Sequence, residues 1–152
     1  MRMSFSGAPE IRASREQVWK ALLDPHFIAS TATAIEKVEE RDATHFGVVA
    51  GLGIGVLKLR FNLNVELFDI VERESAKMRA RGKAPGSTLD ATTSFTLMDA
   101  GPGIVKLAWT ADSEVGGTVA SVGARLLEGT ARRLAEEFWV DFAAKVSELA
   151  AR

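Results

Sequence analysis

Apolar and polar residues alternate strictly along residues 57–67, which read LKLRFNLNVEL. The apolar set points to one side and the charged or amide set to the other, as in an antiparallel strand with one buried and one solvated face. The same period of two recurs in three other runs, at residues 77–83, 88–98 and 104–115. Turn-forming residues lie between the runs, at 41–43, 84–87 and 99–103. We therefore expect the middle of the chain to form an antiparallel meander.

A helical period follows the first predicted strand, which covers residues 3–12. From Ser14 onward, four apolar residues share one helical face: Val18, Trp19, Leu22 and Leu23. Ser14 is expected to cap this helix, with Glu16 and Gln17 in its first turn. Asp24-Pro25 should end it, because the residue before proline disfavours the helical conformation. Residues 26–33 are expected to form another short helical turn.

The last third of the chain has a helical period with one apolar face. After Gly116-Gly117, these residues recur at spacings of three and four: Val119, Val122, Leu126, Thr130, Leu134, Phe138, Phe142, Val146 and Leu149. One helix of about 30 residues would be about 45 Å long. Its apolar face must lie across the inner face of the sheet. The pattern thus predicts one α+β domain over residues 1–152, a curved antiparallel sheet around a long C-terminal helix.

Three glycines alternate with leucine and isoleucine at residues 51–55, within the apolar run 46–57 that reads FGVVAGLGIGVL. A phosphate-binding loop would place them between a buried strand and the N-terminus of a helix. Here an alternating strand follows, the spacing is G-x-G-x-G, and no Gly-Lys-Ser or Gly-Lys-Thr comes after. We interpret the glycines as a sheet corner, where residues 46–50 end one strand and residues 56–67 return.

The predicted inward residues differ greatly in size. Phe61, Phe95 and Trp109 are bulky, whereas six others are small or lightly polar: Ala80, Gly82, Ala91, Thr93, Ala111 and Ser113. Two interpretations stay open, since small residues either let helix and sheet approach closely or leave a cavity. An empty cavity of roughly 300 Å³ would cost about 7 kcal/mol, at about 24 cal/mol per Å³. A cavity of that size should therefore hold ligand or water, or be partly collapsed when empty.

Two segments resemble a known family. SREQVWKALLDP (Ser14–Pro25) is similar to the first-helix signature of the START-like, or SRPBCC, superfamily. VGGTVASVGARLLEGTARRLAEEFWVDF (Val115–Phe142) resembles the C-terminal helix of the CoxG family of carbon monoxide dehydrogenase subunits. The shared features are the paired glycines, the internal Gly123, the segment Arg125-Leu126-Leu127-Glu128-Gly129 and Phe138. The glycine corner with VLKLRF is similar to a further segment of that family.

The resemblance implies a helix-grip fold with a hydrophobic cavity between sheet and C-terminal helix. The cavity would take a lipid-like or quinone-like molecule. The resemblance also implies an accessory role for a molybdenum hydroxylase of the carbon monoxide dehydrogenase type. No resident cofactor is expected.

Our leading hypothesis is non-catalytic binding of a mostly apolar small molecule. The expected cavity lining consists of residues at inward strand positions or on the apolar face of the helix: Phe61, Thr93, Phe95, Trp109, Val122, Leu126 and Thr130. We expect Phe27 and Ile28 near the entrance. One alternative is a small cyclase-type or hydrolase-type enzyme that uses the same cavity, which a buried ionisable cluster would support. The other is an interaction module with a solid interior that helps to assemble a cofactor-loaded enzyme.

Composition narrows these hypotheses. The chain has no cysteine, which excludes disulfides, thiol nucleophiles and thiolate metal sites and fits a cytoplasmic location. A net charge of −1 argues against a dedicated nucleic-acid binder. Neither His26 nor His45 has a second histidine at metal spacing, so no metal site is expected. No G-x-S-x-G segment marks a serine nucleophile, and no residue stands out as catalytic.

Membrane contact is the remaining question from the sequence. The longest uncharged apolar run is Phe46 to Leu57, which is too short for a bilayer span of about 20 residues. Lys77, Arg79, Arg81 and Lys83 form an outward basic stripe that could contact anionic lipid at the membrane periphery or a partner protein. The alternative is ordinary cross-strand pairing with Asp90, Glu66 and Glu72.

Overall fold

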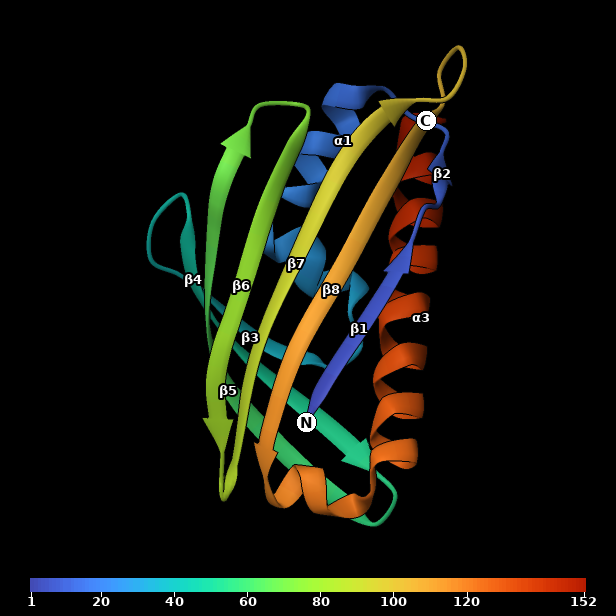
Figure 1. The fold of residues 1–152 in the computed structure, drawn as a ribbon. Helices are drawn as coiled ribbons and strands as arrows, with labels where there is room; N and C mark the ends of the chain where they lie inside the picture. The colour runs from blue at the N-terminus through green and yellow to red at the C-terminus, as the bar shows by residue number, and fades with distance from the viewer.

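The computed structural model describes residues 1–152 and contains one antiparallel sheet of eight strands, three α-helices and one short 3-10 helix (Figure 1). The strands hydrogen-bond in the order β1-β8-β7-β6-β5-β4-β3, and β2 also pairs with β8. Their bounds are β1 Arg2–Gly7, β2 Glu10–Ile11, β3 Ile35–Glu40, β4 His45–Ile54, β5 Leu57–Val71, β6 Ser75–Ala84, β7 Ser87–Asp99 and β8 Val105–Gly117. Strands β3 to β8 follow one another as hairpins, which is the predicted meander.

The first two helices begin at the capping residues that the sequence provides. Before α1 (Arg15–Leu22), the Ser14 hydroxyl accepts a hydrogen bond from the Gln17 backbone N–H. The Gln17 side chain in turn accepts one from the Ser14 N–H. This reciprocal pair satisfies two backbone donors that a helix N-terminus otherwise leaves free. Asp24 caps α2 (Pro25–Thr31), with Pro25 in the first turn, where no N–H is needed.

The C-terminal helical region is divided at Gly123, where the sequence predicted one continuous helix. Thr118–Val122 form the 3-10 helix η1, and α3 then runs from Ala124 to Ala150. Gly123 has a φ of 106°, a conformation that side chains strongly disfavour and glycine accepts. This residue therefore lets the chain change direction between η1 and α3. The predicted helix was too long at its N-terminal end.

The glycine-rich segment is also corrected by the structure. β4 pairs with β5 at every position from His45↔Glu66 to Ile54↔Leu57, so Gly51 and Gly53 lie inside the strand. Leu52 and Ile54 point inward and continue the alternation of the strand, so Gly51 and Gly53 occupy outward positions of β4. Only Gly55 and Val56 make the reversal, and Gly55 has the positive φ of 62° that such a two-residue hairpin favours. The predicted corner exists but is shorter than expected: β4 ends at Ile54, four residues later than predicted, and β5 begins at Leu57, one residue later than predicted.

The long helix closes the concave side of the sheet. α3 contacts β1 and β2 near one edge and β4 near the other, while α1 and α2 lie on the same side (Figure 1). The predicted α+β helix-grip fold is confirmed. Most buried apolar residues form one cluster between the sheet and the helices. A smaller cluster gathers around Phe46 and Val65 on β4 and β5. No helix combines the length and apolarity needed to cross a lipid bilayer.

Candidate functional site

The candidate site lies in the middle of the concave face of the sheet. The strand registers place three successive rows of inward residues side by side across β5, β6, β7 and β8. The rows are Leu67-Met78-Thr93-Ala111, Val65-Ala80-Ala91-Ser113 and Leu63-Gly82-Leu89-Val115. Nine of these twelve residues are partly solvent-accessible, and we call them the floor: Leu63, Met78, Ala80, Gly82, Leu89, Ala91, Thr93, Ala111 and Ser113.

Buried residues surround the floor on all sides, and we call them the rim. None of them is more than 9% exposed: Ala76, Phe95 and Trp109 at one end, Phe61, Ala84 and Ser87 at the other, and Met3, Phe5, Val65 and Leu67 at the sides. An inward side chain on a central strand is accessible only if at least a water-sized space lies over it. Protein interiors rarely leave such spaces. The accessible floor inside a buried rim therefore indicates unfilled volume between the sheet and α3.

The floor is almost entirely apolar. Thr93 and Ser113 carry its only polar side chains, and it has no ionisable group. The Ser113 hydroxyl donates to the backbone carbonyl of Met3 at 3.4 Å. The Thr93 hydroxyl makes no hydrogen bond within the protein, and it is open to solvent because every fully buried side-chain polar atom has a partner. An ion placed on the floor would lose its hydration without gaining an opposite charge.

The two halves of α3 cover this region differently. The C-terminal half contributes four buried residues, Trp139, Phe142, Ala143 and Val146, whereas the N-terminal half contributes only Leu127. Leu126 is 46% exposed and lies beside the β4–β5 turn, where a Cβ on Gly55 would come within 3.3 Å of its Cδ2 atom. The helix is thus anchored mainly through its C-terminal half.

The predicted lining residues separate into several groups. Thr93 lies on the floor, while the predicted aromatic residues belong to the rim. Phe95 packs edge-on against Trp19 with ring centroids 6.3 Å apart, and Trp109 stacks on Trp139 at 5.7 Å. Phe61 is 1% exposed. These three aromatic side chains fill space at the ends of the floor.

The other predicted residues lie on the helices. Val122 in η1 and Thr130 in α3 are partly buried, and Leu126 is half-exposed. In α2, Phe27 packs edge-on against Phe142 with centroids 5.7 Å apart, and Ile28 is buried. Phe27 thus contributes to the packing between α2 and α3.

Sequence reasoning did not include most floor residues among the site residues. It identified Ala80, Gly82, Ala91, Ala111 and Ser113 as inward and small, but selected the larger neighbours as lining. The available signal was small size on consecutive inward positions of adjacent strands. That signal becomes clear only when the strand register is known.

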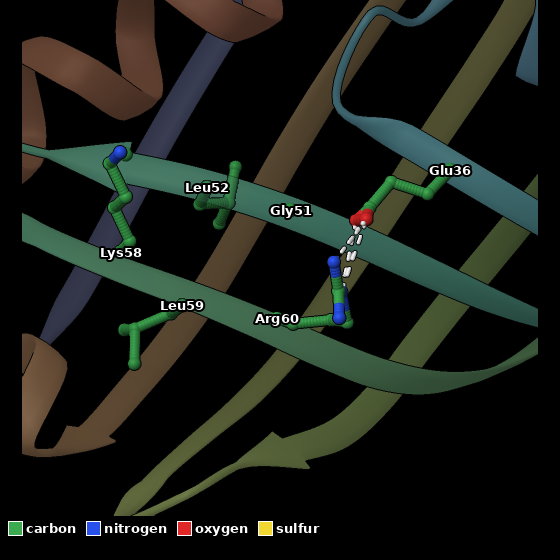
Figure 2. A pocket seen from close by; sticks show the side chains of 7 residues that line it. Glu36, Gly51, Leu52, Lys58, Leu59 and Arg60 are labelled. Carbon is green, nitrogen blue, oxygen red and sulfur yellow. Dashed lines mark hydrogen bonds and ion pairs between the residues drawn. The ribbon is translucent and has the colours of Figure 1, made fainter.

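A second hollow is lined by residues of β3, β4 and β5 (Figure 2), and its exposed residues Glu36, Lys58 and Arg60 place it on the solvent-facing side of the sheet. Its volume is about 460 Å³, and its lining is Glu36, Gly51, Leu52, Gly53, Lys58, Leu59 and Arg60. It exists because the two glycines leave the surface of β4 low between the longer side chains. Arg60 lies 3.0 Å from Glu36, and hydrogen bonding to that carboxylate raises the pKa of Arg60. This hollow is open to solvent, and two of its three charged residues, Glu36 and Arg60, are paired with each other, so we assign the candidate site to the floor.

Two of the four residues in the basic stripe of β6, Lys77 and Arg79, are paired with carboxylates on the neighbouring strands. Arg79 donates two hydrogen bonds to the Asp90 carboxylate, at 3.1 and 2.8 Å. These bonds raise the pKa of Arg79 and lower that of Asp90. Lys77 lies 3.6 Å from Asp69. The predicted pairing with Asp90 is confirmed, whereas Glu66 hydrogen-bonds to His45 instead.

The histidines lie on the surface. His26 is 3.6 Å from Glu40, and His45 is 2.9 Å from Asp42 and 3.2 Å from Glu66. The hydrogen bond to Asp42 raises the pKa of His45. Hydrogen bonds from the Thr44 backbone and from His45 lower the pKa of Asp42 to about 2. No group of three or more His, Asp or Glu residues is arranged to hold a metal ion.

The curved sheet, its covering C-terminal helix and the accessible floor between them define a START-like domain of the helix-grip type. Within that class, the chain belongs to the CoxG family of carbon monoxide dehydrogenase subunits, whose model matches residues 7–147. The family predicted from residues 14–25 and 115–142 is confirmed.

Several solved structures share the fold. A conserved protein from Geobacillus kaustophilus is 23% identical, with 96% of each chain covered and a TM-score of 0.86. The ZhuI aromatase/cyclase from Streptomyces sp. R1128 is 16% identical over 100% of this chain and 97% of that one, with a TM-score of 0.73. A START superfamily protein from Mycobacterium smegmatis is 15% identical over 96% and 98%, with a TM-score of 0.68. At these identities the likeness establishes the fold alone. None of the curated protein sequences compared with the chain matches it.

Proposed function

We propose that this protein binds an uncharged, mostly apolar small molecule, lipid-like or quinone-like, between the floor and α3, without catalysing its conversion. The observation that carries this proposal is the accessible floor inside a buried rim. Burial of apolar ligand surface would supply the affinity, at roughly 25 cal/mol per Å² before the costs of association. The accessible floor also favours binding over the alternative of an assembly module with a solid interior.

The enzymatic alternative has less support. A cyclase or hydrolase needs acid and base groups within reach of its substrate. The floor has no ionisable side chain, and the groups with shifted pKa values, Asp42, His45, Arg60, Arg79 and Asp90, lie on solvent-facing parts of the sheet or its turns. The likeness to an aromatase/cyclase concerns the fold.

The test of binding is native mass spectrometry of the purified protein, followed by extraction into organic solvent and identification of the extracted molecules. We expect an apolar compound that remains bound under native conditions and is released on unfolding. The matched variants are Ala91→Phe, which fills the centre of the floor, and Thr96→Phe, which points outward on the same strand. Loss of the compound in the first variant and retention in the second are expected. Equal retention in both variants would place the compound elsewhere.

We also propose that the protein acts beside a molybdenum hydroxylase of the carbon monoxide dehydrogenase type, in the cytoplasm. The description of its family supports this association. The test is affinity purification of the tagged chain from cells that make it naturally, with quantitative mass spectrometry. We expect enrichment of the components of such a hydroxylase over a purification from untagged cells. If no such component is enriched although the tagged chain is recovered, the association is wrong.

A further inference from the structure

Thr93 differs from every other residue of the floor. It lies on β7 near the centre of the sheet, between Met78 of β6 and Ala111 of β8. Its neighbours on the floor are hydrocarbon side chains or glycine, apart from Met78 with its thioether and Ser113, whose hydroxyl already donates to Met3. The Thr93 hydroxyl is therefore the one floor donor with no partner in the protein. Water can satisfy this hydroxyl while the floor is uncovered, because the floor is accessible.

A ligand that covers the floor removes that water. A buried hydroxyl without a partner loses the free energy of its hydrogen bonds to water, and a molecule that leaves it unpaired binds less tightly as a result. A molecule with an acceptor at this point avoids the loss. The hydroxyl thus discriminates between ligands of the same shape.

We propose that Thr93 determines the ligand class by donating a hydrogen bond to an oxygen or nitrogen acceptor of an uncharged, otherwise apolar molecule. This inference rests on the proposed function, which it refines. The rest of the ligand is expected to be apolar, because the floor offers no second hydrogen-bond donor without a partner. Anionic ligands are disfavoured, because no cationic side chain lies on the floor to replace the water around a carboxylate.

Three tricyclic probes of nearly equal shape separate these effects. Fluorene is a hydrocarbon, 9-fluorenone adds one carbonyl oxygen, and 9-fluorenone-4-carboxylate adds a negative charge. Binding is measured by titration of the tryptophan fluorescence, since Trp109 and Trp139 stack at one end of the floor. We expect wild-type protein to bind 9-fluorenone roughly tenfold more tightly than fluorene, as expected for one hydrogen bond in place of an unpaired donor. The carboxylate should bind at least about a hundredfold more weakly than 9-fluorenone.

The decisive variant is Thr93→Val, which keeps the shape of the side chain and removes the hydroxyl. It should weaken 9-fluorenone roughly tenfold and leave fluorene unchanged or tighter. Thr93→Ser keeps the donor and should keep the preference for 9-fluorenone. This result would attribute the loss in Thr93→Val to the missing hydroxyl and not to a general disturbance of the site. Thr92→Val is the matched control, because Thr92 is adjacent on the same strand and points to the outer face. It should leave all three affinities unchanged.

The outcomes separate this inference from the function on which it rests. Binding of fluorene and 9-fluorenone with equal affinity, or equal weakening of both by Thr93→Val, would overturn the role of Thr93 while apolar binding stands. Binding of the carboxylate as tightly as 9-fluorenone would overturn the uncharged class. If wild-type protein binds none of the probes and yields no apolar compound on extraction, the proposed function is wrong, and the role of Thr93 is overturned with it.

Discussion

The concave face of one sheet contains two regions with opposite packing. Where α1 and the C-terminal half of α3 cover it, large aromatic rings fill the space. Phe95 contacts Trp19, Trp109 contacts Trp139, and Phe142 is fully buried. One row further along β7 and β8, Thr93 and Ala111 are accessible. Both regions belong to the same regular strands, so the size of the inward side chains and the helices that cover them separate a packed core from an open floor.

This difference indicates how the fold tolerates unfilled space. The aromatic region joins the sheet to three helices and supplies much of the apolar burial. The floor lies beside it, and only three of the nine floor residues, Leu63, Leu89 and Ala111, pack against the main buried cluster. Stability and the capacity to bind a ligand therefore depend on different rows of the same strands.

The largest expected effect comes from the packed region. Phe142 is 0% exposed and contacts the rings of Phe27, Phe138 and Trp139. Phe142→Ala should lower the free energy of unfolding by about 3–5 kcal/mol, because it removes a buried ring and leaves a cavity. Urea denaturation followed by circular dichroism measures this. A loss below about 1 kcal/mol would mean that the aromatic region does not carry the stability assigned to it.

A matched pair of substitutions compares the two regions directly. Ala76 and Ala91 are both inward alanines on central strands, but Ala76 is 2% exposed in the rim and Ala91 is accessible on the floor. Ala76→Phe should destabilise the fold by about 1–3 kcal/mol through overpacking, whereas Ala91→Phe should remain within about 1 kcal/mol of wild type. The same denaturation experiment decides. Equal losses at both positions would mean that no space lies over Ala91.

The smallest expected effect concerns pH. His45 has a raised pKa, so the stabilisation from its pairing is present below pH 6.5 and is lost as pH rises through the folded pKa. Asp42 has a lowered pKa of about 2, so its contribution is present above its ordinary value of 3.8 and is lost as pH falls towards 2. Both groups are exposed, which keeps the effect on stability small.

An NMR titration of His45 measures this pairing. Asp42→Asn should shift the His45 pKa back towards 6.5. Binding of 9-fluorenone should stay constant from about pH 5 to 8, because the floor has no group that titrates there. A binding midpoint that follows the His45 titration would connect the surface pair to the interior and contradict the separation of the regions.

The fold was largely predictable because alternation reports which face a residue occupies. The period of two in residues 57–67 and 104–115 gave the inward set correctly, and Ser14 gave the start of α1. The break at Gly123 was missed because residues 118–122 keep a helical spacing although they form a 3-10 helix. The β4–β5 turn was misplaced because glycines inside a strand resemble glycines in a turn, even though Leu52 and Ile54 preserve the alternation.

The candidate site was less predictable than the fold. The alternation along the strand placed Phe95 and Thr93 on the same face. It could not show that Phe95 packs against Trp19 whereas Thr93 is accessible to solvent. That difference depends on the long-range position of α1 and α3 along the strands. The sequence pattern does not contain that position.

The cross-strand pairs on the outer face have a consequence for the interior. The Arg79–Asp90 pair joins β6 to β7, and a shift of one residue between these strands would separate it. The same shift would turn Asp90 or Thr92 towards the floor and place a charge or a second hydroxyl there. The charge pair on the outer face thereby helps to fix the register between β6 and β7. A shift of one residue would therefore separate the charges outside and place a polar side chain over the floor inside at the same time.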